Sequence, residues 1–185
     1  VPESSNSRSL SFCTSINHAN EMAQFFSRNG VPAVSITSNS TAVERAEAIS
    51  KLKTREIQMI CAVDIFNEGI DIPELDTILF LRPTESPLIF LQQLGRGLRL
   101  APGKNSVTVL DFVGVQRAEY RFGRKLEALL GQRQLSIKES IENDFPYLPS
   151  GCQITFDRQS KELVLSNIRS QLSTKSQYCL LYTSD

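Results

Sequence analysis

The sequence predicts an α/β fold in which a mainly parallel sheet is followed by a small, mostly helical appendage. Short apolar runs alternate with segments of helical periodicity from residue 10 to residue 114. This strand–helix–strand repetition is typical of a parallel sheet. The run IQMICAV (57–63) is apolar nearly throughout, as expected for a strand that is buried on both faces of such a sheet.

The first two strands are predicted at LSFCT (10–14) and AVSIT (33–37), with a helix between them. Asn17 can cap this helix, and Asn29-Gly30 can end it just after Arg28. Its buried side is expected to carry Met22, Phe25 and Phe26.

A second helix is predicted between AVSIT and the buried strand IQMICAV. Thr41 and Glu44 have the spacing of a capping box, in which the two side chains satisfy backbone N–H groups at the start of a helix. The apolar positions of this helix are Ala46, Ile49 and Leu52.

Two further strands are predicted at DTILFLR (76–82) and SVTVLDFVG (106–114). The segment DIFNEGIDIPEL (64–75), which follows IQMICAV, is interpreted as a loop. Ser86-Pro87 provides a cap followed by a proline suited to the first position of a helix. That helix is expected to run to about Leu98.

The pattern changes after Gly114. Residues 116–133 are predicted as an amphipathic helix with five basic and only two acidic side chains. A short strand at CQITFD (152–157) and a helix at 159–172 follow. These features divide the chain into a linker (1–9), an α/β domain (10–115), a helical appendage (116–175) and an irregular or artefactual tail (176–185).

Charge and composition limit the function. Lys+Arg and Asp+Glu number 20 each, so the chain has no overall basic field and any polyanion site must be local. The four cysteines form no CxxC pair and the single His18 has no cluster around it, which argues against a metal site. Buried, reduced thiols and the lack of a long apolar run favour a cytoplasmic protein with no membrane partner.

The stretch QQLGRGLR (92–99) carries the strongest functional signal. On a helix, Gln92, Arg96 and Arg99 project from one side. The stretch contains no acid, and guanidinium groups bind the oxygens of phosphates in pairs. It is therefore interpreted as a site for a phosphate chain, with a solvated basic edge, or pairing with acids elsewhere in the fold, as the alternative.

The remaining residues of this helix add two expectations. Gly95 and Gly97 are poor helix formers, which indicates that something approaches the backbone closely. The side opposite the arginines is expected to pack on the sheet through Leu91, Leu94 and Leu98.

The loop DIFNEGIDIP (64–73) is the second functional candidate. Asp71 can accept hydrogen bonds from ribose hydroxyls, and Gly69 allows a ligand close to the backbone. A plain polar turn is the alternative, and the spacing of Asp64, Glu68 and Asp71 fits no calcium or zinc pattern. Because ligands of parallel sheets bind at the carboxyl ends of strands, both candidate sites are expected there.

The segment CAVDIFNEGIDIPELDTILFLRPTESPLIFLQQLGRGLR (61–99) closely resembles motifs V and VI of superfamily 2 helicases, and SLSFCTSINHANEMAQFF (9–26) resembles motif IV. The nearest subgroup is that of the DEAD/DEAH-box-like helicases related to type I and type III restriction-enzyme motors. The resemblance covers about residues 8–115. The segment 148–172 also resembles a region that follows the motor in some restriction-type helicases.

The resemblance implies that the chain is the second, C-terminal RecA-like lobe of a two-lobed ATPase motor. ATP with Mg²⁺ would bind between this lobe and an N-terminal RecA-like lobe. That lobe would supply the phosphate loop, and the Mg²⁺ ion would be held mainly by it. Arg99 would be the arginine finger and Arg96 its companion, both catalytic. The ATP-binding residues implied by the motifs are Gln92, Arg96, Arg99, Gly69 and Asp71.

On the nucleic-acid side, the resemblance implies contacts through Thr14 and Ser15 of motif IV and Asp64 of motif V. Two positions depart from the common pattern. Gln93 stands where many relatives carry a basic residue, and Val63 stands where motif V often has a threonine. Without this threonine hydroxyl, the predicted contact of motif V with the nucleic-acid backbone is weaker.

The chain is thus predicted to be part of an ATP-dependent helicase or translocase that acts on single- or double-stranded DNA in restriction or defence, with a nuclease domain as partner. Alone it is not expected to hydrolyse ATP. Two alternatives stay open: an ATPase-dead module of RecA-like fold that binds nucleic acid or protein, and a DNA-repair translocase.

Overall fold

The computed structural model describes residues 7–63, 72–83, 86–112, 122–131 and 135–181, and for 171–181 the backbone alone. The chain forms two compact units. The α/β unit comprises Val1–Thr84 and Gln92–Phe112, and the helical unit comprises Glu85–Leu91 and Val113–Asp185.

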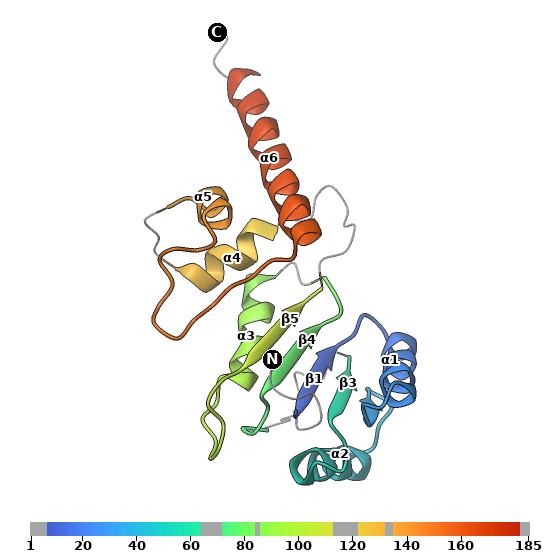
Figure 1. Ribbon diagram of the computed structural model, residues 1–185. Helices are drawn as coiled ribbons and strands as arrows, with labels where there is room; N and C mark the ends of the chain where they lie inside the picture. The colour runs from blue at the N-terminus through green and yellow to red at the C-terminus, as the bar shows by residue number, and fades with distance from the viewer. Residues whose placement is uncertain (1–6, 64–71, 84–85, 113–121, 132–134, 182–185) are drawn as a thin grey trace. The chain divides into compact units, whose positions relative to one another are not determined.

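The α/β unit contains a five-stranded sheet in the order β2-β3-β1-β4-β5, and each neighbouring pair is parallel (Figure 1). Phe12 lies beside both Ala62 and Phe80, so the carboxyl ends of the central strands share one edge of the sheet. The prediction of an α/β fold with a parallel sheet is therefore confirmed. The strands are β1 (Ser9–Phe12), β2 (Ala33–Ile36), β3 (Met59–Ala62), β4 (Thr77–Phe80) and β5 (Thr108–Asp111).

Burial decreases from the centre of the sheet to its β5 edge. All four residues of β1 and of β3 are buried, whereas β5 is half-buried at its start and exposed at its end. The predicted strand at 57–63 is confirmed as β3, and its apolar character follows from burial on both faces.

Helix α1 (Ile16–Arg28) connects β1 to β2 and begins two residues earlier than expected from the sequence. Its N-cap is Ser15, whose hydroxyl accepts a hydrogen bond from the His18 N–H, so the prediction of Asn17 as cap was wrong. The buried residues of α1 are Ala19 and Ala23, which pack against Cys13, Met59, Cys61 and Leu79.

The buried side of α1 is consequently narrower than predicted. Met22 and Phe26 pack partly against this cluster, but Phe25 is 55% exposed. Small alanines at the contact bring the helix close to the sheet, which leaves no room for a third large side chain. Cys13 and Cys61 are buried free thiols, as predicted.

Helix α2 (Ala42–Thr54) begins with the predicted capping box. The Thr41 hydroxyl accepts a hydrogen bond from the Glu44 N–H at 3.2 Å, and the Glu44 carboxylate accepts one from the Thr41 N–H at 2.7 Å. The bonds that the Glu44 carboxylate accepts from the Thr41 N–H and the Thr41 hydroxyl lower the pKa of Glu44. Leu52 is buried as expected, whereas Ala46 is exposed and Ala48 takes its place in the core.

Helix α3 (Pro87–Gly97) follows β4 and begins with proline at its first position, as predicted. The Ser86 hydroxyl accepts a hydrogen bond from the Ile89 N–H at 3.4 Å. The helix ends one residue before Leu98, where it was expected to end.

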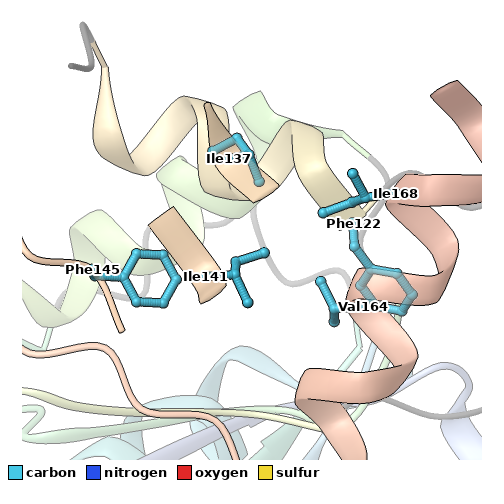
Figure 2. Close-up of a cluster of buried hydrophobic side chains, with 6 residues drawn as sticks. All are labelled: Phe122, Ile137, Ile141, Phe145, Val164 and Ile168. Carbon is cyan, nitrogen blue, oxygen red and sulfur yellow. The ribbon is translucent and has the colours of Figure 1, made fainter. Parts of the chain in front are cut away.

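The helical unit contains α4 (Phe122–Leu130), α5 (Ile137–Glu142) and α6 (Arg158–Leu181). Its core is a cluster contributed by these helices and by the turn after α5 (Figure 2). Ser136 and Glu139 form a second capping box at the start of α5. The buried members of the cluster are Phe122, Ile137, Ile141, Phe145, Val164 and Ile168.

Three features of this unit differ from the prediction. Residues 152–157 form no strand, and their Ile154 and Phe156 side chains pack on the helical cluster instead. Lys125, one of the basic residues of the predicted amphipathic helix, is buried, with its ammonium 5.1 Å from the centre of the Phe90 ring. Helix α6 continues to Leu181, into the segment expected to be irregular.

Candidate functional site

The motif VI residues lie in the α/β unit, on the last part of α3 and just beyond it. Gln92 and Arg96 are four residues apart on the helix and therefore share one side of it. Arg99 lies two residues after the helix ends. Gln92 and Arg99 are exposed, and Arg96 is half-buried.

The side of α3 that packs on the sheet is not the one predicted. Leu91 and Leu98 are 38% and 60% exposed, whereas Gln93 and Gly97 are buried. Gly97 determines this contact because it has no side chain and its backbone lies against β4. A Cβ on Gly97 would lie 2.6 Å from Cδ1 of Ile78.

The two glycines of the motif consequently have different roles. The close approach expected at Gly97 is made by the protein's own sheet, through Ile78 and Val107. Gly95 is exposed, and a Cβ placed on it would meet nothing within 4 Å. Packing within the described part of the chain thus gives no reason for glycine at position 95, which leaves its backbone open to a ligand.

The arginines also lie at the other edge of the sheet from the one predicted. Gly97 is next to Ile78, near the start of β4, and to Val107, just before β5. An 11-residue helix is about 16 Å long, so α3 carries the chain from the carboxyl edge back to the amino edge. The expectation that this site lies at the carboxyl ends of the strands was therefore wrong.

Gln93 is a buried polar residue whose importance the sequence did not indicate. Its side chain is fully buried, and neither its Nε2 nor its Oε1 atom has a hydrogen-bond partner among the described residues. A buried amide without partners loses its hydration and gains nothing in return. Its position was noted only because many relatives have a basic residue there.

Replacing Gln93 with Met, which has a similar shape and no amide, should raise the free energy of unfolding by about 1–2 kcal/mol. Urea unfolding followed by circular dichroism measures the change. Gln92→Met, on the exposed side of α3, is the matched control and should change stability by at most about 0.5 kcal/mol. A loss of stability in Gln93→Met would mean that the buried amide is satisfied after all.

The motif IV residues lie at the opposite, carboxyl edge of the sheet. Thr14 and Ser15 follow β1 and are exposed at the start of α1, whose first turn contains no acidic residue. His18 Nδ1 lies 2.9 Å from the Thr14 hydroxyl and 3.2 Å from the Thr14 N–H. From the sequence, His18 was considered only as a metal ligand and this contact was not predicted, although the spacing of four residues from Thr14 at a helix start was visible.

Asp64, Gly69 and Asp71 lie outside the described residues, so their predicted roles stay predictions. Among the residues that the structure describes, no three His, Cys, Asp or Glu side chains gather closely enough to hold a metal ion. No helix in the described part of the chain has both the length and the apolar character needed to cross a membrane.

Comparison with known proteins identifies relatives of this chain. The model of the helicase conserved C-terminal domain matches residues 2–101. IRC3 of Saccharomyces cerevisiae, assigned as an ATP-dependent helicase, is 37% identical over 97 residues, which cover 52% of this chain and 14% of IRC3. The ATP-dependent RNA helicase MAK5 of Candida albicans is 26% identical over 144 residues, which cover 76% of this chain and 18% of MAK5. The chain thus spans less than a fifth of either relative.

Solved structures share the fold. The E. coli DEAD-box protein SrmB, bound to RraA, superimposes with a TM-score of 0.53 at 22% identity, over 60% of this chain and 64% of SrmB. Domain 2 of the DEAD-box helicase Mss116p, bound to an RNA duplex, gives a TM-score of 0.54 at 17% identity, over 89% and 58% of the two chains. These likenesses give the RecA-like architecture. The chain belongs to the helicase conserved C-terminal domain family of the DEAD/DEAH-like superfamily 2 helicases.

Proposed function

We propose that this chain is the second motor lobe of an ATP-dependent helicase or translocase that moves along nucleic acid. The observation that carries the proposal is the placement of Gln92 and Arg96 on one side of α3, and of Arg99 two residues beyond its end, in a chain of this family. ATP, with Mg²⁺, would bind between this lobe and an N-terminal lobe of the same protein.

The chemistry assigned to this lobe is electrostatic. The Arg99 guanidinium would contact the γ-phosphate and stabilise the negative charge that develops as the phosphoryl group is transferred. Arg96 and Gln92 would bind the phosphates beside it. If Gly69 and Asp71 hold the ribose, they would complete the nucleotide contacts of this lobe.

The nucleic-acid contact would be made at the carboxyl edge of the sheet by Thr14 and Ser15, together with Asp64. The start of α1 supports this assignment, because backbone N–H groups at a helix N-terminus attract phosphate and no acid in the first turn opposes it. Contacts of this kind read the backbone and not the bases, so binding should be insensitive to sequence and sensitive to salt.

DNA is the proposed track, in a restriction or defence system that includes a nuclease. The proposal rests on the resemblance of motifs IV to VI and of residues 148–172 to restriction-type motors. Relatives such as MAK5 are named as RNA helicases, so the choice between DNA and RNA is the first result that an experiment has to give.

ATP hydrolysis by the full-length protein tests the proposal, with single-stranded DNA, double-stranded DNA and RNA compared. DNA should stimulate hydrolysis, and the DNA concentration needed should rise at least about tenfold between 50 and 200 mM salt. Stimulation by RNA alone would contradict the assignment of DNA. If the protein binds nucleic acid but does not hydrolyse ATP, the chain is part of an ATPase-dead binding module and not of a motor. Cleavage of the DNA in the same assay would support the nuclease partner.

A further inference from the structure

The end of α3 is held by a lysine from outside the helix. The Lys104 ammonium donates hydrogen bonds to the backbone carbonyls of Gly97, Arg99 and Pro73, the last two at 2.8 and 2.9 Å. An ammonium group has three N–H donors, and the three carbonyls use all of them. We call this arrangement the Lys104 clamp.

A tight turn brings Lys104 back to the helix it holds. The Lys104 N–H donates to the Ala101 carbonyl at 3.2 Å, which closes a four-residue turn. Pro102 occupies the second position of this turn, and Gly103 occupies the third with φ of +75°. Proline followed by a residue with positive φ is the pattern of a type II turn, in which glycine at the third position avoids strain.

The clamp has two partners that matter for the candidate site. The carbonyls of Gly97 and Arg99 belong to the end of motif VI, where a helix leaves its last carbonyls without intrahelical partners and favours a nearby cation. Pro73 immediately follows the residues that resemble motif V. Lys104 therefore joins the chain beside Arg99 to the chain that follows Gly69 and Asp71.

The environment of the ammonium fits a structural role. Burial lowers the pKa of Lys104, while Asp76 and Glu74 act in the opposite direction. With its three donors occupied by carbonyls, the ammonium is committed to the backbone and is not itself placed to contact a phosphate.

We propose that Lys104 is a positioning residue for Arg99, because it fixes the backbone from which the guanidinium extends and ties it to the segment after motif V. This inference rests on the proposed function, in which Arg99 contacts the transferred phosphate. In this role Lys104 acts through the backbone that it holds.

A double-mutant cycle on nucleic-acid-stimulated ATP hydrolysis by the full-length protein tests this role. Lys104→Met keeps the apolar stem and removes the donors. It should lower kcat on the order of 10- to 100-fold, as expected for a displaced catalytic group, and change KM for ATP by at most about twofold. In an Arg99→Ala background it should lower kcat no further. An equal loss in both backgrounds would overturn the proposal.

Two other variants complete the cycle. Lys51→Met removes a half-buried lysine of α2 whose partner is Glu47 at 2.7 Å, and it should leave kcat unchanged. Lys104→Arg keeps the charge and the donors in a different geometry and should recover part of the kcat lost in Lys104→Met. If Lys104→Met does not fold, Lys104→Arg takes its place in the cycle, and a kcat equal to that of the parent would then overturn the proposal.

Hydrogen exchange of the nucleotide-free protein separates the clamp from the proposed function. Backbone amides between residues 98 and 104 should exchange at least about tenfold faster in Lys104→Met, because the hydrogen bonds that restrain this segment are lost, while α1 should be unaffected. Unchanged exchange there would show that the clamp does not hold the backbone. Failure of the proposed function would appear differently, as an unchanged kcat in Arg99→Ala alone.

Discussion

Replacing Arg99 with Ala should lower the nucleic-acid-stimulated kcat for ATP hydrolysis of the full-length protein by about 10³-fold or more. The expected loss is large because an arginine finger contacts charge that is greatest in the transition state. Steady-state ATP hydrolysis at saturating nucleic acid measures it. KM for ATP should change much less, since the contact contributes little to binding of the ground state.

Arg28→Ala is the matched control for the lost charge. Arg28 is exposed in the last turn of α1, outside the resembling motifs V and VI, and its removal should leave kcat unchanged. If Arg99→Ala raises KM for ATP and leaves kcat at the parent value, Arg99 binds the nucleotide without acting as a finger. If both constants equal those of the parent, Arg99 is not part of the ATP site.

The second large effect concerns the two glycines of α3. Gly97→Leu should lower the free energy of unfolding by about 3 kcal/mol, because a side chain there would enter the space of Ile78, which is fully buried. At Gly95 the same substitution places a side chain in open space. It should raise the free energy of unfolding by roughly 0.5–1 kcal/mol, because leucine favours the helix more than glycine does. Urea unfolding measures both values.

The Gly95→Leu variant distinguishes an effect on stability from an effect on ATP hydrolysis. A Gly95→Leu protein that is more stable yet hydrolyses ATP more slowly would support close approach of a ligand to the backbone there. A Gly95→Leu protein with the parent kcat would show that this glycine has no such role. Gly97→Leu should impair both properties together, because it displaces the whole end of the helix.

Local signals in the sequence predicted local structure well. The capping box of Thr41 and Glu44 needs only residues three apart, and it is present as predicted. The apolar run at β3 reports burial on both faces directly. By contrast, the cap of α1 is Ser15 and not Asn17, because two polar residues within one turn offer the same chemistry and only the path of the chain decides between them.

Contacts distant in the sequence were the ones that could not be predicted. The packed side of α3 depends on Gly97 meeting Ile78. Of the three leucines predicted to pack on the sheet, Leu91 and Leu98 are exposed and Leu94 is half-buried. The Lys104 clamp joins carbonyls as far away as Pro73, 31 residues earlier. The arginines could be identified from the sequence because their motif is local. The edge of the sheet at which they lie could not be, because it depends on the length and direction of α3.

The parallel register keeps Thr14 and Arg99 apart by the full height of the sheet. A four-residue strand is about 13 Å long, whereas charges on exposed groups are screened within about 8 Å at physiological ionic strength. Phosphates bound at the carboxyl edge and at the amino edge of the sheet would therefore interact only weakly through their charges. Communication between them has to be mechanical, carried by rigid displacement of hydrogen-bonded strands.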